Sequence, residues 1–161
     1  MKIIFLDIDG VLNSVAWMKA EAAAAGNDTT ENTIGWNKVD PAACARLNRI
    51  ITATGAKIVV SSTWRKMLCL SAIRGVLLGS GVTYPVPIID KTPVLHKPRG
   101  LEIQAWLDEF HNSNLVEDFV ILDDDGDMEH LVDKLVQTSC ETGLLDEHVD
   151  RAIEILERVS A

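Results

Sequence analysis

Short runs of apolar residues alternate along the chain with longer segments in which apolar residues recur at helical spacing. Five of the short runs predict buried β-strands, at 3–6, 57–60, 86–89, 119–122 and 135–138. Four of the longer segments predict helices, at 40–55, 64–78, 98–110 and 145–159. This alternation predicts an α/β fold, a doubly wound, Rossmann-like parallel sheet with helices on both faces.

Two parts of the pattern are less regular. Pro85 and Pro87 interrupt the run at 86–89, which is therefore either an edge strand or a loop. Before the first long helix, an Ala-rich patch is followed by a polar stretch, and together they predict a small helix and flap inserted at about 13–40. The length of 161 residues predicts a single domain over 1–161.

The charges are divided unevenly along the chain. Fifteen Lys and Arg against 24 Asp and Glu give a net charge of −9, which argues against a strongly basic nucleic-acid binder. Residues 1–99 nevertheless carry a net charge of +5, whereas residues 100–161 carry −14. Residues 1–99 can therefore bind an anion, and residues 100–161 can bind a cation.

The cysteines and the hydropathy of the chain indicate its cellular compartment. The three cysteines are widely separated and form no C-x-x-C pair, so neither a disulfide framework nor a zinc site is predicted. The first residues lack the apolar core of a signal peptide, and no apolar run approaches the roughly 18 residues of a membrane span. We expect a cytoplasmic protein without membrane contact, and no feature indicates an obligate protein partner.

Polar clusters follow three of the predicted strands, at the point where each strand ends. They are Asp7 to Gly10, Ser61 to Arg65 and Asp123 to Asp127. Because the carboxyl ends of parallel strands lie at one edge of the sheet, these clusters predict a site there. The D-x-D-G motif of the first cluster fits a solvated turn equally well when taken alone.

The ordered set of four motifs is more specific than any one of them. IIFLDIDGVLN, KIVVSSTWR, HKPRG and FVILDDDGDM together resemble the haloacid dehalogenase (HAD) superfamily. ARLNRIITATGAKIVVSSTWR, RGLEIQAWL and LVQTSCETGLLDEHVDRAIEIL are similar to the HAD domain of Swiss Army Knife RNA repair proteins. The resemblance implies a HAD-like, Rossmann-like fold and phosphoryl transfer through an aspartyl-phosphate.

The resemblance also implies catalytic roles. Asp7 would be the nucleophile, and Asp9 would protonate the leaving oxygen and later activate water. Ser61 would donate a hydrogen bond to the transferring phosphoryl group, which also needs a cation nearby. Lys97 and Arg99 both flank Pro98 and both suit that role, with Arg99 slightly favoured.

The acidic clusters predict a metal site as well. An ionised Asp7 beside the acids at 123–125 would be crowded with negative charge unless a hard cation such as Mg²⁺ were bound among them. We expect the Asp7 carboxylate, the Asp9 backbone carbonyl and the Asp124 carboxylate as ligands, with Asp123 behind them or in contact through water. Asp125 and Asp127 are interpreted as parts of a solvated turn.

The residues after Ser61 have two interpretations each. Ser62 and Thr63 are candidate substrate-binding residues, but Ser and Thr also cap helices, and that role is favoured. Arg65 could bind a substrate phosphate with both arms of its guanidinium or could be an exposed arginine in a first helical turn. The four tryptophans, Trp64 among them, are interpreted as structural.

The gaps between the motifs leave room for a minimal cap or none, so the site should be open to a polymer end. Residues 57–99 hold seven basic residues and one acid, which suits a phosphate-rich substrate. The sequence therefore predicts a Mg²⁺-dependent phosphomonoester hydrolase whose partner is a phosphorylated substrate, an RNA or DNA end. The alternatives are a phosphatase of nucleotides or other small phosphoesters, a non-catalytic phosphate-binding or phosphoacceptor module, and a metal-dependent nuclease.

Overall fold

The sheet has five strands, all parallel, in the order β3-β2-β1-β4-β5. In the computed structural model, which describes residues 1–26, 37–111 and 115–158, the strands are β1 (Lys2–Leu6), β2 (Lys57–Val60), β3 (Ile88–Lys91), β4 (Asp118–Asp123) and β5 (Leu135–Gln137). The predicted α/β fold with a parallel sheet is confirmed. The first strand lies at the centre, so its carboxyl end is flanked by the ends of β2 and β4.

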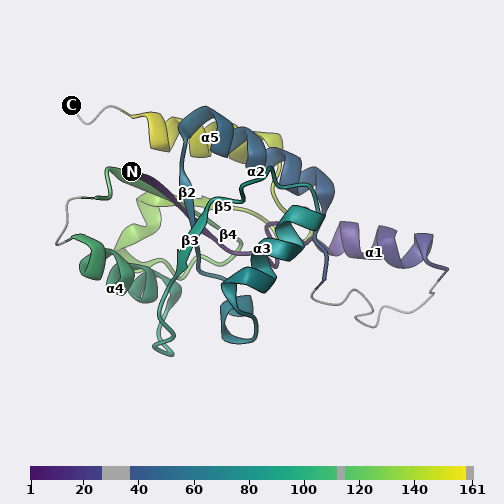
Figure 1. Cartoon of the computed structure of the whole chain (residues 1–161), viewed down its shortest axis with the longest axis horizontal. Helices are drawn as coiled ribbons and strands as arrows, with labels where there is room; N and C mark the ends of the chain where they lie inside the picture. The colour runs from purple at the N-terminus through teal and green to yellow at the C-terminus, as the bar shows by residue number, and fades with distance from the viewer. Residues whose placement is uncertain (27–36, 112–114, 159–161) are drawn as a thin grey trace.

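Helices cover both faces of the sheet, as predicted (Figure 1). One face packs against α2 (Pro41–Thr54), α3 (Leu70–Gly79) and α5 (Asp146–Glu157), and the other packs against α4 (Arg99–His111) and the 3₁₀ helix η2 (Glu129–Lys134). Side chains of β1 alternate between the two cores, with Ile4 and Leu6 in one and Ile3 and Phe5 in the other. No helix in the described parts of the chain is long and apolar enough to cross a membrane.

Two predicted elements differ in their bounds. The helix predicted at 64–78 is divided into a 3₁₀ turn, η1 (Thr63–Lys66), and α3, because the side chains of Trp64 and Arg65 are buried and turn the chain inward before the helix starts. The strand predicted at 86–89 begins at Ile88, after Pro87, and occupies the edge position. Proline has no N–H for a sheet ladder, which explains both the late start and the edge.

The predicted insertion at about 13–40 contains one described helix, α1 (Val15–Ala24). Its N-cap is Ser14, whose hydroxyl accepts a hydrogen bond from the Trp17 N–H at 3.1 Å. None of the residues of α1 is buried, and Figure 1 shows the helix standing away from the sheet. The remainder of the predicted flap, at 27–36, lies outside the described residues.

Candidate active site

Three carboxylates meet at the carboxyl ends of β1 and β4. Asp7 follows β1 directly and Asp123 ends β4, and the parallel register that pairs Leu6 with Leu122 places the two acids side by side. The Asp7 N–H continues the ladder by donating to the Leu122 carbonyl at 2.9 Å. One oxygen from each of Asp7, Asp123 and Asp124 lies within 4.8 Å of the others.

The electrostatics of this trio favour a bound cation. Burial raises the pKa of Asp7 above its ordinary value, although Arg99 and a hydrogen bond from Ser62 partly offset the effect. Burial and the neighbouring Asp7 carboxylate raise the pKa of Asp123 to about 7. Burial also raises the pKa of Asp124. Each acid would ionise more readily beside a positive ion.

The donor set suits Mg²⁺, which prefers carboxylate oxygens. Gly10 adds an independent observation, because it has a φ of +78° and a Cβ built on it would lie 2.2 Å from Cγ of Asp124. A side chain at position 10 would therefore displace the Asp124 carboxylate from the trio. The acidic cluster of this domain thus forms a candidate metal site; that the Asp9 carbonyl is a ligand remains a prediction.

Arg99, the first residue of α4, is the cation that faces the acids. Its Nη1 lies 2.9 Å from Oδ2 of Asp123 and 3.5 Å from Oδ1 of Asp7. Burial alone would lower the pKa of Arg99, but the carboxylates of Asp123 and Asp7 outweigh it and raise that pKa. Lys97 is exposed and has no hydrogen bond or ion pair within the described residues. Of the two candidate cations, only Arg99 contacts the acids in the described part of the chain.

The turn after β4 fixes the start of α4. Asp127 accepts a hydrogen bond from the Arg99 N–H at Oδ2 (2.9 Å), and its carbonyl accepts one from the Gly100 N–H (3.1 Å). Gly100 permits this approach, since a Cβ there would lie 2.2 Å from the Met128 carbonyl oxygen. Asp127 is exposed, as expected of a turn residue, but it also holds the helix that carries Arg99. Asp125 is exposed at the same turn.

The Asp9 carboxylate is held by two side chains. Trp64 donates from Nε1 to one oxygen at 2.9 Å, and Asn13 donates from Nδ2 to the other at 3.1 Å. The sequence predicts only a structural role for Trp64, whereas in the structure Trp64 also contacts Asp9, the expected acid–base residue. The signal was present in the sequence, because Trp64 lies just after β2, next to β1 in the sheet.

The serines after β2 differ in their surroundings. Ser61 lies beside β1, since its N–H donates to the Leu6 carbonyl at 3.0 Å. Its hydroxyl is buried and has no hydrogen-bond partner among the described residues. Ser62 caps η1 by accepting from the Trp64 N–H at 3.3 Å, which confirms the favoured interpretation, and it also hydrogen-bonds to Asp7. Thr63 is exposed and begins η1.

The structure contradicts both predictions for Arg65. Its side chain is 1% exposed and forms a buried ion pair with Glu102. The remaining N–H groups donate to four backbone carbonyls, those of Ser61, Ser62, Thr92 and Pro93. The guanidinium is therefore neither exposed nor directed at a substrate, because its donors already join three segments of the protein.

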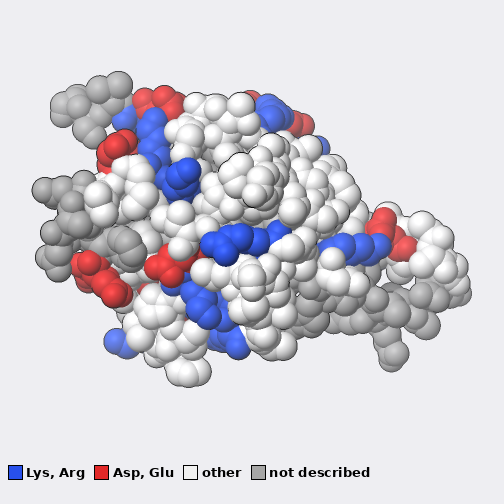
Figure 2. Space-filling model, in the orientation of Figure 1, with Lys and Arg blue, Asp and Glu red and all other residues white. Residues whose placement is uncertain are grey.

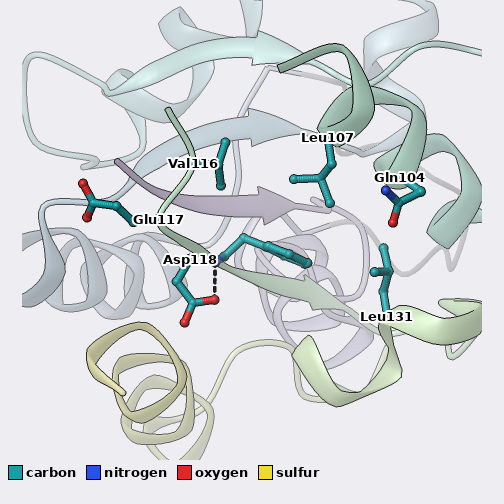
Figure 3. Close-up of a pocket in the computed structure, with 7 residues that line it drawn as sticks. Gln104, Leu107, Val116, Glu117, Asp118 and Leu131 are labelled. Carbon is teal, nitrogen blue, oxygen red and sulfur yellow. Dashed lines mark hydrogen bonds between the residues drawn. The ribbon is translucent and has the colours of Figure 1, made fainter. Parts of the chain in front are cut away.

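A hollow of about 210 Å³ lies elsewhere, at the amino end of β4 (Figure 3). Seven residues line it, Gln104, Leu107, Val116, Glu117, Asp118, Phe119 and Leu131. Asp118 begins β4 and Asp123 ends it, so this hollow and the acidic trio lie at opposite ends of the same strand. Its charged lining is acidic, which is unsuitable for a phosphate.

Comparison with known proteins identifies one family. No match was found among curated proteins, and none was found among solved structures. The model of one protein family, described as the HAD domain in Swiss Army Knife RNA repair proteins, matches residues 3–149. That range extends from β1 into α5 and contains all three acids of the trio together with Arg99. Because the match covers most of the chain, the protein belongs to the family of HAD domains in Swiss Army Knife RNA repair proteins.

Proposed function

We infer that this protein is a Mg²⁺-dependent phosphomonoester hydrolase that forms an aspartyl-phosphate on Asp7 and acts on the terminal phosphate of a polynucleotide. The observation that carries this proposal is the convergence of Asp7, Asp123 and Asp124 with Arg99 in a HAD domain. HAD domains are usually phosphatases, and an acidic trio facing one arginine suits phosphoryl transfer.

In the first step, an oxygen of Asp7 attacks the phosphorus atom. The bond from phosphorus to the leaving oxygen breaks, and Asp9 gives its proton to that oxygen. In the second step, Asp9 takes a proton from water, whose oxygen attacks the same phosphorus atom. The bond to Asp7 then breaks, phosphate leaves and Asp9 is protonated again, so that both residues return to their starting state.

The surrounding residues would prepare these steps. Trp64 and Asn13 hold the Asp9 carboxylate in one orientation, which reduces the entropy lost on reaching the transition state. Arg99 offsets part of the negative charge around Asp7, and the unpartnered hydroxyl of Ser61 suits a phosphoryl oxygen. A Mg²⁺ ion held by Asp7, Asp123 and Asp124 would supply further positive charge for the equatorial oxygens.

Two observations favour a polynucleotide end over a small metabolite. The family is described by its occurrence in RNA repair proteins. The described part of the insertion, α1, stands away from the sheet and buries none of its residues, so it does not enclose the site. A site that α1 leaves uncovered suits a long substrate.

Phosphate release tests the proposal directly. The substrates are 3′-phosphorylated and 5′-phosphorylated oligonucleotides and the matching mononucleotides, each with and without Mg²⁺. Asp7→Asn is the test variant, and Asp133→Asn, which removes an exposed acid on η2, is the matched control. We expect metal-dependent turnover by the unchanged protein and by the control, none by Asp7→Asn, and faster turnover of oligonucleotides. Turnover that survives in Asp7→Asn would refute the aspartyl-phosphate route.

A further inference from the structure

The two sides of the candidate active site carry opposite charge. On the β4 side, Asp124, Asp125 and Asp127 lie in the turn after β4, and Asp124 is also a member of the acidic trio. On the other side, toward the β3 edge of the sheet, the η1 turn contributes Lys66 and the β3–α4 segment contributes Lys97, both exposed. A polynucleotide whose terminal phosphate lies at Asp7 would therefore leave the site on the β2–β3 side.

We call residues 63–67 and 92–97 the β2–β3 rim. Its two segments are joined from below by Arg65, which donates from Nε to the Thr92 carbonyl at 3.1 Å and from Nη2 to the Pro93 carbonyl at 3.3 Å. Lys91 returns a hydrogen bond to the Arg65 carbonyl at 3.2 Å, and the Leu95 N–H donates to Glu102 at 2.8 Å. The rim is thus a fixed surface, and binding to it would cost little ordering of the backbone.

The lysines of the rim are available to a ligand. Neither Lys66 nor Lys97 has an acidic partner within the described residues. The single acid of residues 57–99, Asp90, is half-buried and accepts a hydrogen bond from Nε1 of Trp106 at 2.8 Å. In the view of Figure 2, Lys and Arg are spread over the visible face of the molecule, and one group of them lies at its lower edge. This local basic surface stands out in a chain with a net charge of −9.

The rim also exposes large apolar side chains beside its lysines. Met67 is 64% exposed, Val94 40% and Leu95 41%. Lysines interleaved with flat or flexible apolar side chains suit a single strand, whose phosphates need positive charge and whose unpaired bases need an apolar surface. A purely acidic protein segment would pair with the lysines but would have no apolar side chains to contact Met67, Val94 and Leu95.

We propose that the nucleotides next to the terminal phosphate bind across the β2–β3 rim, with Lys66 and Lys97 at their backbone phosphates and Met67, Val94 and Leu95 against their bases. The inference rests on the proposed function in that it takes the strand end to lie at Asp7. It adds a direction, because the strand leaves the site over β2 and β3 and away from the acidic turn after β4.

The test compares binding and turnover in variants that replace lysine by glutamine, in which each single variant loses the same charge as the control. The test variant is Lys66→Gln combined with Lys97→Gln, and the two single variants are measured as well. Lys57→Gln is the control, because Lys57 is also exposed but begins β2, at the opposite end of the strand from the site. The first readout is the ratio of kcat/KM for a phosphorylated oligonucleotide to that for the matching mononucleotide, measured over a range of salt concentrations.

We expect this ratio to fall at least about fivefold in the double variant at low salt and to stay constant in the control. The dependence of log kcat/KM on log salt concentration for the oligonucleotide should become shallower by about 0.7 for each phosphate contact removed. A constant ratio in the double variant would overturn the proposal. So would an equal loss on both substrates, since that would place the lysines at the reacting phosphate.

A second readout separates this inference from the proposed function. A fluorescent oligonucleotide without a terminal phosphate is titrated with protein in EDTA, so that neither chemistry nor metal contributes to binding. We expect weaker binding by the double variant than by Lys57→Gln. If the unchanged protein shows no turnover, this difference still supports the rim. Absence of oligonucleotide binding by the unchanged protein would overturn the nucleic-acid assignment and would point to an acidic protein partner.

Discussion

Breaking the buried ion pair of Arg65 and Glu102 should destabilise the protein, because it would leave the Arg65 charge buried without a counter-charge. Glu102→Gln keeps the size of the side chain and an oxygen that can accept from the Leu95 N–H, but it removes the charge that faces Arg65. Removing one partner of a buried pair costs roughly 3–5 kcal/mol. We expect the lower end, about 3 kcal/mol, because the guanidinium keeps its four carbonyl acceptors. In a chain of this length the melting temperature should fall by about 6–12 °C.

Thermal and urea unfolding at one pH and one ionic strength provide the assay. Glu154→Gln is the matched control, because Glu154 pairs with Arg151 and Arg158 on the exposed side of α5. Its shift should be much smaller, since solvent and salt screen an exposed pair. Equal shifts in the two variants would refute the reasoning, because they would mean that the buried pair contributes no more than an exposed one.

Four further predictions concern the acidic trio and Asp9. Mg²⁺ affinity should rise with pH between about 6 and 8, because the pKa of Asp123 is raised to about 7 and a protonated carboxyl must lose its proton near the ion. Calorimetry in buffers of different ionisation enthalpy would detect that proton, and a flat affinity over this range would contradict the prediction. The same raised pKa means that the contribution of Asp123 to the stability of the metal-free protein is lost as pH rises through about 7. Gly10→Ala should weaken Mg²⁺ binding by roughly 10-fold to 100-fold, because the new Cβ would displace Asp124; calorimetry showing unchanged affinity would exclude this. Trp64→Phe should lower kcat by roughly tenfold with little change in KM, because it removes a hydrogen bond to the Asp9 carboxylate. Steady-state kinetics on a mononucleotide would check this, and a rise in KM alone would contradict it.

The location of the acids could be predicted from the sequence because strand ends carry the information locally. An apolar run shows where a strand stops, and parallel pairing then brings Asp7 and Asp123 to the same edge. The choice between Lys97 and Arg99 was not available from the sequence, because the start of α4 is set by Asp127, 28 residues further along the chain.

The buried position of Arg65 could not be predicted from the sequence for a related reason. Its acceptors at Thr92 and Glu102 lie 27 and 37 residues away, and no local pattern reports such contacts. Trp64 shows the opposite case. Its partner Asp9 is 55 residues away, but both follow neighbouring strands, so that sheet order alone would have brought them together.

The central position of β1 determines which part of the sheet unfolds last. This strand is paired on both sides, and Ile3, Ile4, Phe5 and Leu6 have no exposed surface, so its amides should be among the last to exchange with solvent deuterium. The edge strands β3 and β5 are each paired on one side only, so local opening there needs less free energy. Asp7, the proposed nucleophile, is thus attached to the most protected strand of the sheet, so local opening at either edge of the sheet would leave its position unchanged.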